Sequence, residues 1–96
     1  MKTPVLIRCD KDGVVFALFP TIPGTLHRHT CTCYEIVGEH HSADIRHCIN
    51  VSNPATQLES QDILTILKRR GYELEVFQRV SAKMHNERYK ELERTK

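Results

Sequence analysis

The stretch TPVLIRCDKDGVVFALF, residues 3–19, holds two runs of β-forming residues separated by a turn sequence. In residues 3–9, apolar side chains recur at every second position, which is the period of a β-strand. The sequence DKDG at 10–13 favours a tight turn, because Asp accepts local hydrogen bonds and Gly adopts positive φ. Residues 14–19 are almost all apolar, mainly β-branched or aromatic. A β-hairpin is therefore predicted here, and the other elements are placed around it.

After this hairpin, the first half of the chain alternates between loops and strand-forming segments. Residues 20–30 contain two prolines and a glycine, so a surface loop is expected there. Strand-forming residues return at 31–37, and the polar residues 38–44 are interpreted as a connection. Alternation resumes at 45–51. It favours a fourth strand, with a helical turn around 41–47 as the alternative.

The second half predicts two helices flanking one strand. Residues 63–67 place four apolar side chains on one helical stripe, and Gly71 marks the end of that helix. Alternation in 72–80 predicts another strand, in which Phe77 falls on the polar side. Residues 81–95 predict a last helix with a narrow apolar line and charges nearly all round. We expect that helix to pack loosely or to dock on another chain.

The element order ββββαβα predicts a single α+β domain over residues 1–96. It would contain a largely antiparallel sheet, one helix packed across a face and a C-terminal helix. The composition, 40% hydrophobic and 27% charged, is typical of globular proteins and unlike disordered chains. No apolar run approaches the ~18–20 residues of a membrane span. The N-terminus has no apolar signal region, so we expect a cytoplasmic protein with no membrane partner.

Residues 27–48, HRHTCTCYEIVGEHHSADIRHC, contain five of the six histidines and three of the four cysteines. Thiolate and imidazole are the ligands that zinc prefers. Cys31 and Cys33 would share one side of a strand, and His40 or His47 could complete a site. The Cys-x-Cys spacing, however, differs from the Cys-x2–4-Cys knuckles of zinc fingers. Zinc binding is therefore one alternative, and buried cysteines with solvated histidines are the other.

The same cysteines raise the question of catalysis. Cys31 or Cys33 paired with a nearby histidine could form a reactive thiolate. Neither cysteine adjoins a predicted helix N-terminus, and the sequence has no Cys-x-x-Cys motif and no glycine-rich phosphate loop. We therefore expect a protein without catalytic activity of its own.

Cationic side chains gather in the second half, where residues 49–96 carry nine Lys and Arg against seven Asp and Glu. A nucleic-acid interface is thus a second alternative. Its candidate contacts are Lys68, Arg69, Arg70 and Arg79. The other cations of this half are Lys83, Arg88, Lys90, Arg94 and Lys96. Basic residues at a helix end more often interact with the helix dipole than with phosphate.

The segments ALFPTIPG at 17–24 and CTCYEIVGEHHSAD at 31–44 resemble a small family of bacterial proteins often carried on plasmids, phages or other mobile elements. The resemblance continues through NPAT at 53–56 and covers about residues 14–85. It implies a compact bacterial domain with no assigned activity. His40 is the position that it marks as functional.

The sequence as a whole favours a small binding or accessory module that recognises a partner protein. The expected surface lies where the loop 20–30 approaches the connection 38–44. Its candidate residues are Arg28, Tyr34, His40 and His41. Pairing through an exposed strand edge or through the final helix would give a homodimer.

Overall fold

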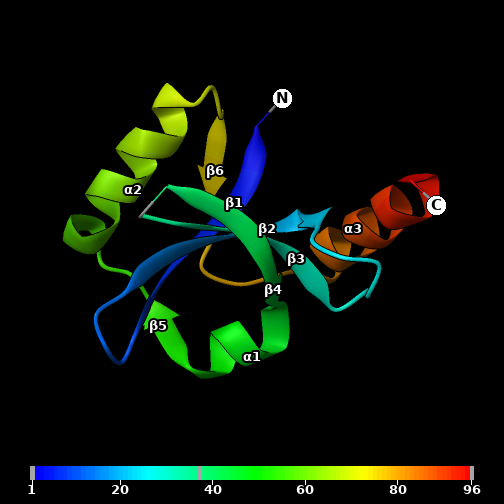
Figure 1. Ribbon diagram of the computed structural model, residues 1–96, viewed down its shortest axis with the longest axis horizontal. Coiled ribbons are helices and arrows are strands. Elements are labelled where there is room, and N and C mark those ends of the chain that lie inside the picture. Colours follow the sequence, from blue (N-terminus) through cyan, green and yellow to red (C-terminus); the bar gives the residue numbers. More distant parts are fainter. Residues whose placement is uncertain (1, 37, 96) are drawn as a thin grey trace.

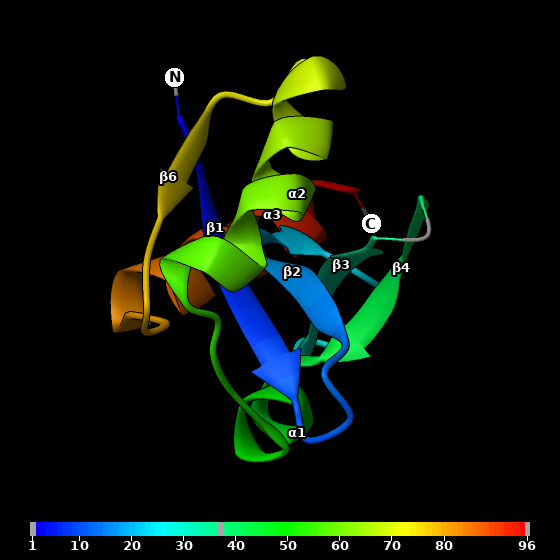
Figure 2. The same cartoon turned by 90° about the vertical axis from the view of Figure 1, so that its left-hand side faces the viewer.

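Helices cover both faces of a central sheet in the computed structural model, which describes residues 2–36 and 38–95. The elements in chain order are β1 (Thr3–Asp10), β2 (Val15–Pro23), β3 (Thr30–Glu35), β4 (Glu39–Asp44), α1 (Ile45–Asn50), β5 (Ser52–Pro54), α2 (Gln57–Arg69), β6 (Leu74–Val76) and α3 (Ala82–Thr95). Figure 1 shows α2 and α3 at opposite sides of the sheet. In Figure 2, α2 lies in front of β1 and α3 behind it.

The sheet has the order β4-β3-β2-β1-β5, and each of these pairings is antiparallel. β6 pairs with β1 in the parallel sense. β5 and β6 share the outer side of β1, with Pro54 opposite Arg8 and Val76 opposite Val5. The predicted α+β class with a largely antiparallel sheet is confirmed.

β1 and β2 form the predicted hairpin, in which Leu6 lies opposite Leu18. The Asp10 side chain closes its turn, because Oδ1 accepts the backbone N–H groups of Asp12 at 2.9 Å and of Val14 at 3.0 Å. This turn needs only local residues. It is accordingly a part of the fold that the sequence predicts directly.

Both faces of this hairpin are buried. On one face, Val5, Ile7 and Phe19 pack with Ile63 and Leu67 of α2. This confirms the prediction that one helix crosses a face of the sheet. The opposite face, which lies beneath α1, has its own buried cluster of Leu6, Phe16, Leu18, Cys31, Cys33 and Ile45.

The expected loop at 20–30 is wrong at both ends, because β2 continues to Pro23 and β3 begins at Thr30. The pairing of β2 with β3 shifts between Phe19 and Pro23. Such a bulge accommodates a proline, which has no N–H for the ladder. It also leaves the carbonyl of Pro20 available to a side chain from elsewhere in the chain.

The expected fourth strand at 45–51 is also wrong, because 45–50 is the helix α1 and the strand β4 occupies 39–44. Asp44 caps α1 by accepting the His47 backbone N–H at 3.0 Å. Ile45 and Ile49, four residues apart, then share the helix face that packs on the sheet. β4 has few apolar residues because it is an outer strand, exposed along most of its length.

The last two elements depart from expectation in different ways. β6 spans only 74–76 instead of 72–80, so Phe77 lies past the strand and packs with the cluster beneath α1. α3 lies where it was predicted but does not pack loosely. Met84, Arg88 and Leu92, spaced by four residues, are buried, at 6%, 1% and 3% exposure. The helix is therefore held to the domain through a face that includes an arginine.

Candidate functional site

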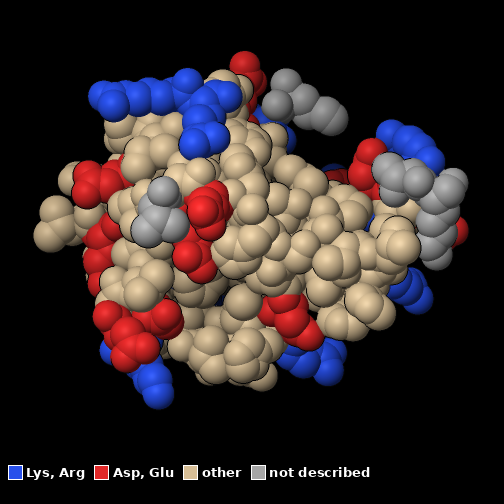
Figure 3. Space-filling model, viewed as in Figure 1, with Lys and Arg blue, Asp and Glu red and all other residues tan. Residues whose placement is uncertain are grey.

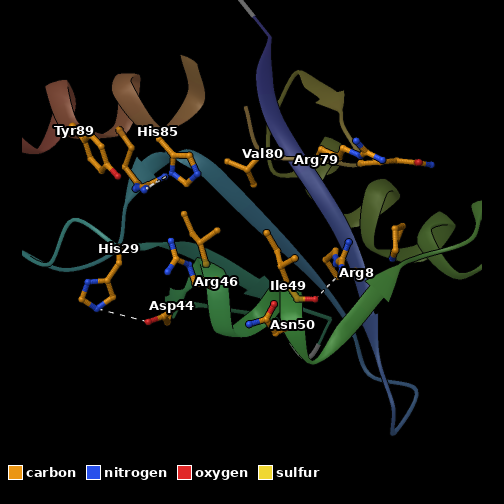
Figure 4. Close-up of a pocket in the computed structure, with 14 residues that line it drawn as sticks. Arg8, His29, Asp44, Arg46, Ile49, Asn50, Arg79, Val80, His85 and Tyr89 are labelled. Carbon is orange, nitrogen blue, oxygen red and sulfur yellow. Dashed lines mark hydrogen bonds and ion pairs between the residues drawn. The ribbon is translucent and has the colours of Figure 1, made fainter. Parts of the chain in front are cut away.

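A pocket of about 850 Å³ lies between α1 on one side and α3 with the preceding segment 78–80 on the other. Figure 4 shows Arg46 and Ile49 of α1 facing His85 of α3 across this space. Its lining is strongly basic: the cationic or titratable bases are Arg8, Arg46, Arg79, Arg88, His29 and His85, and the acidic residue is Asp44. The apolar part of the lining includes Ile45, Ile49 and Val80.

Arg88 is fixed deep in this pocket by three hydrogen bonds. Its Nε donates to the carbonyl of Arg28 at 3.0 Å, and Nη1 donates to the carbonyl of Pro20 at 2.7 Å. Nη2 lies 2.8 Å from Nδ1 of His85. Burial lowers the pKa of the Arg88 guanidinium. None of its partners in the described part of the chain is a carboxylate, so its charge has no counter-ion there.

Arg8 is the second buried arginine, at 6% exposure, and it comes from the middle of β1. Its Nε donates to Ser52 Oγ at 2.9 Å, and Nη2 donates to the carbonyls of Ile49 at 3.0 Å and Ser52 at 2.7 Å. Burial lowers the pKa of this guanidinium too. Nη1 has no hydrogen-bond partner among residues 2–36 and 38–95, and no carboxylate contacts the side chain there.

Asp44 does not neutralise this pocket, because its carboxylate is already engaged. Oδ1 caps α1, and Oδ2 lies 3.7 Å from Nε2 of His29. The hydrogen bond from the His47 backbone N–H is the main cause that lowers the pKa of Asp44. The carboxylate therefore stays ionised but is directed at the helix start and at an exposed histidine.

His85 is held in one tautomer by Arg88. A guanidinium can only donate, so Nδ1 of His85 accepts and the proton of the neutral ring is on Nε2. Burial is the first cause that lowers the pKa of His85, followed by the charges of Arg88 and Arg46. The neutral ring presents an additional N–H donor to the site.

This lowered pKa predicts a loss of stability in acid. The unfolded chain binds a proton at His85 below about pH 6.5, whereas the folded chain resists it, so the free energy of unfolding falls as the pH drops through this window. Urea unfolding from about pH 8 to about pH 5 should show a smaller loss for His85→Asn than for the wild type. Asn keeps an acceptor for Arg88 but does not titrate. Equal losses in the two proteins would contradict this assignment.

The four residues predicted as zinc ligands are not brought together. Cys31 and Cys33 are buried beneath α1, at 0% and 2% exposure. His40 pairs with Tyr34 on the opposite face, and His47 is exposed on α1. Within residues 2–36 and 38–95, no group of three or more His, Cys, Asp or Glu could hold a metal ion. Zinc binding stays a prediction without a site among these residues.

Cys31 and Cys33 should be unreactive in the native protein, because burial raises the pKa of each thiol to about 12. Alkylation at about pH 8 followed by peptide mass spectrometry should modify these two cysteines only after unfolding. Cys9 and Cys48, which are half-buried, are the internal controls and should react before these two. Equal labelling of Cys31 in native and denatured protein would show that its thiol is accessible. That result would support the hypothesis of thiol catalysis.

The four residues predicted as a partner surface are divided between the two faces. Tyr34 is fully buried, beneath the ring of His40 at a centroid distance of 4.7 Å. His41 Nε2 contacts Glu35 Oε1 at 3.0 Å. The Arg28 guanidinium instead stacks on the Tyr89 ring at 4.1 Å, beside the pocket. Tyr34 therefore cannot contact a partner directly. Pairing of two copies through an exposed strand edge or through the final helix stays a prediction.

His40, which the family resemblance marks, lies on the face away from the pocket. Its Nε2 is 3.0 Å from the Tyr72 hydroxyl. The buried Tyr34 hydroxyl beneath it has no hydrogen-bond partner within the described residues. These aromatic contacts join β3 and β4 to Tyr72, in the segment that follows α2.

The predicted nucleic-acid residues also separate. Lys68 and Arg69 extend from the last turn of α2, where Figure 3 shows basic side chains at the upper left with acidic ones on the same face. Arg70 Nη2 donates to the carbonyl of Gly38 at 3.3 Å. Arg79 lines the pocket instead. Nucleic-acid binding stays a prediction.

No protein-family model, curated protein or solved structure matches the chain. In residues 2–36 and 38–95, no helix combines the length and apolar character needed to cross a membrane.

The buried arginines Arg8 and Arg88 were not predicted as site residues. Arg8 is the one cation within an otherwise apolar strand, and Arg88 lies four residues from both Met84 and Leu92. A cation placed at core spacing is a detectable signal, because isolated buried charges are rare. The narrow apolar line predicted for residues 81–95 did not include Arg88.

Proposed function

We propose that this protein is a small binding module whose ligand is an anion held in the pocket between α1 and α3. The observation that supports this most directly is the burial of Arg8 and Arg88 without a carboxylate among their described partners. Burying a charge costs several kcal/mol, and hydrogen bonds to neutral carbonyls compensate this cost without supplying an opposite charge. A carboxylate or phosphate group would supply the missing negative charge and accept charge-assisted hydrogen bonds.

The size and chemistry of the pocket fit a small molecule. Its volume, about 850 Å³, is in the range of small-ligand sites, and its lining mixes apolar side chains with a few polar groups. Arginine stays protonated near neutral pH, and His85 Nδ1 is already occupied by Arg88. These groups suit the binding of an anion better than proton transfer, so we propose binding without catalysis.

A phosphate titration followed by amide NMR tests this proposal. At constant ionic strength, saturable shifts are expected in α1, in 78–80 and around His85, with a Kd on the order of 1 mM for so small an ion. The matched variants are Arg46→Gln in the pocket and Arg69→Gln on α2. Only Arg46→Gln should weaken binding. Absence of saturation would contradict the proposal, as would shifts centred on Lys68 and Arg69, which would favour a nucleic-acid surface instead.

We further propose that the module acts in the cytoplasm. All four cysteines are free, and Cys31 and Cys33 belong to the core, which suits a reducing compartment. Fractionation of cells that produce the protein at native levels would check this, and recovery from an exported fraction would contradict it.

A further inference from the structure

The two buried arginines of the pocket belong to separate groups of donors. In Figure 4, Arg8 lies at one end beside Ile49, and His85 lies towards the other end. Arg88 belongs to the second group, because its Nη2 is 2.8 Å from Nδ1 of His85. The Arg8 group is anchored on α1 and β5, through the carbonyls of Ile49 and Ser52. Different backbone segments therefore hold the two guanidiniums apart.

The region between these two groups is apolar. Val80 and Ile49 lie between Arg8 and His85 in Figure 4. The exposed Arg46 and Arg79 also line the pocket, with Arg46 on the His85 side of Ile49 and Arg79 on the Arg8 side of Val80. Ile45, also in the lining, is 4% exposed and belongs to the core cluster beneath α1, against which Ile49 and Val80 pack. A charged atom placed against this surface would lose hydration without gaining a hydrogen bond. The middle of the pocket consequently favours an uncharged segment of ligand.

Both ends retain unused donors. Nη1 of Arg8 has no hydrogen-bond partner among the described residues, although Nε and Nη2 are both engaged. At the other end, Arg88 is engaged through Nε, Nη1 and Nη2 and also interacts with the Tyr89 side chain, so the further donor there is Nε2–H of the neutral His85 ring. A compact ion such as phosphate would satisfy one end and leave the other charge unpaired.

We infer that the ligand of this pocket is an elongated dianion, with one anionic group at Arg8, the other at Arg88 and His85, and an apolar segment between them. This inference rests on the proposed function, because it names the class of anion that the same site binds. Straight-chain α,ω-dicarboxylates are the simplest molecules of that class. Their two charges are carried at the ends of an apolar chain whose length can be varied.

Calorimetric titration at constant ionic strength tests the inference. Dicarboxylates of increasing chain length are each compared with the monocarboxylate of equal length and with inorganic phosphate. We expect a clear optimum length, at which the dicarboxylate binds about tenfold or more tightly than its monocarboxylate, since a charge-assisted hydrogen bond contributes about that factor. Arg8→Met should reduce this dicarboxylate to the affinity of the monocarboxylate of equal length.

The outcomes separate this inference from the proposed function. If phosphate and monocarboxylates bind but no dicarboxylate binds more tightly, the inference is overturned and the anion site stands. If no anion binds, both fail. Should Arg8→Met not fold, the chain-length profile of the wild type decides alone: an optimum supports two anchoring groups, and a flat profile overturns them.

Discussion

Replacing Arg88 with Met should lower the free energy of unfolding by about 2–4 kcal/mol. The substitution keeps an unbranched apolar side chain beside Met84 and Leu92 but removes all three hydrogen bonds of the guanidinium. The carbonyls of Arg28 and Pro20 then lose a donor, which costs more than the pairing itself contributed. Relief of the buried charge offsets only part of this loss.

Arg94→Met is the matched control, because Arg94 is on the same helix, exposed, and paired with Glu91 only at the surface at 3.2 Å. That change should alter stability by less than about 0.5 kcal/mol. Urea unfolding of both variants and the wild type measures the difference. A more stable Arg88→Met protein would mean that burial of the guanidinium costs more than its hydrogen bonds contribute. The packing of α3 would then not depend on these bonds.

Leu67→Ala should cost about 2–5 kcal/mol, the range for truncating a fully buried leucine. Leu67 is 0% exposed and packs between α2 and the sheet, in the cluster that contains Val5 and Phe19. Removing its side chain leaves a cavity between α2 and the sheet. We expect the largest single loss of stability among aliphatic truncations in α2 at this position or at Ile63.

The control lies on the same helix. Leu58 is 78% exposed near the first turn of α2, so Leu58→Ala removes the same atoms from a site with few contacts. It should change the free energy of unfolding by less than about 0.5 kcal/mol. Thermal or urea unfolding compares the pair directly. Similar losses for Leu67→Ala and Leu58→Ala would show that α2 is not packed as described.

Local patterns predicted the parts of the fold that local interactions decide. The turn of the first hairpin depends on Asp10 and Gly13, and α2 begins where Thr56 and Glu59 cap each other, all within a few residues. Segment 45–51 is different, because apolar side chains there fit both a strand period and a helix period. Asp44 caps a helix at this point, and in the described chain no strand pairs with the outer side of β4. Both features favour the helix.

The site could not be predicted in the same way, because its residues meet only after the sheet has formed. Arg88 binds the carbonyl of Pro20, 68 residues away, and that carbonyl is available because β2 bulges there. Arg8 reaches Ser52, 44 residues away. The histidine and cysteine content of 27–48 was the most visible signal in the sequence. However, strand alternation directs His40 to the face opposite Cys31 and Cys33, and His47 is exposed on α1.

The side-chain N–H signals of the buried arginines provide the most direct test of anion binding. The Nε–H groups of Arg8 and Arg88 are hydrogen-bonded and shielded from water, so nitrogen–proton NMR can follow them while phosphate is added at constant ionic strength. Our account predicts that at least one of these two signals shifts along a saturable curve, while the exposed Arg69 does not. Buried signals that stay fixed at every phosphate concentration would contradict the anion site.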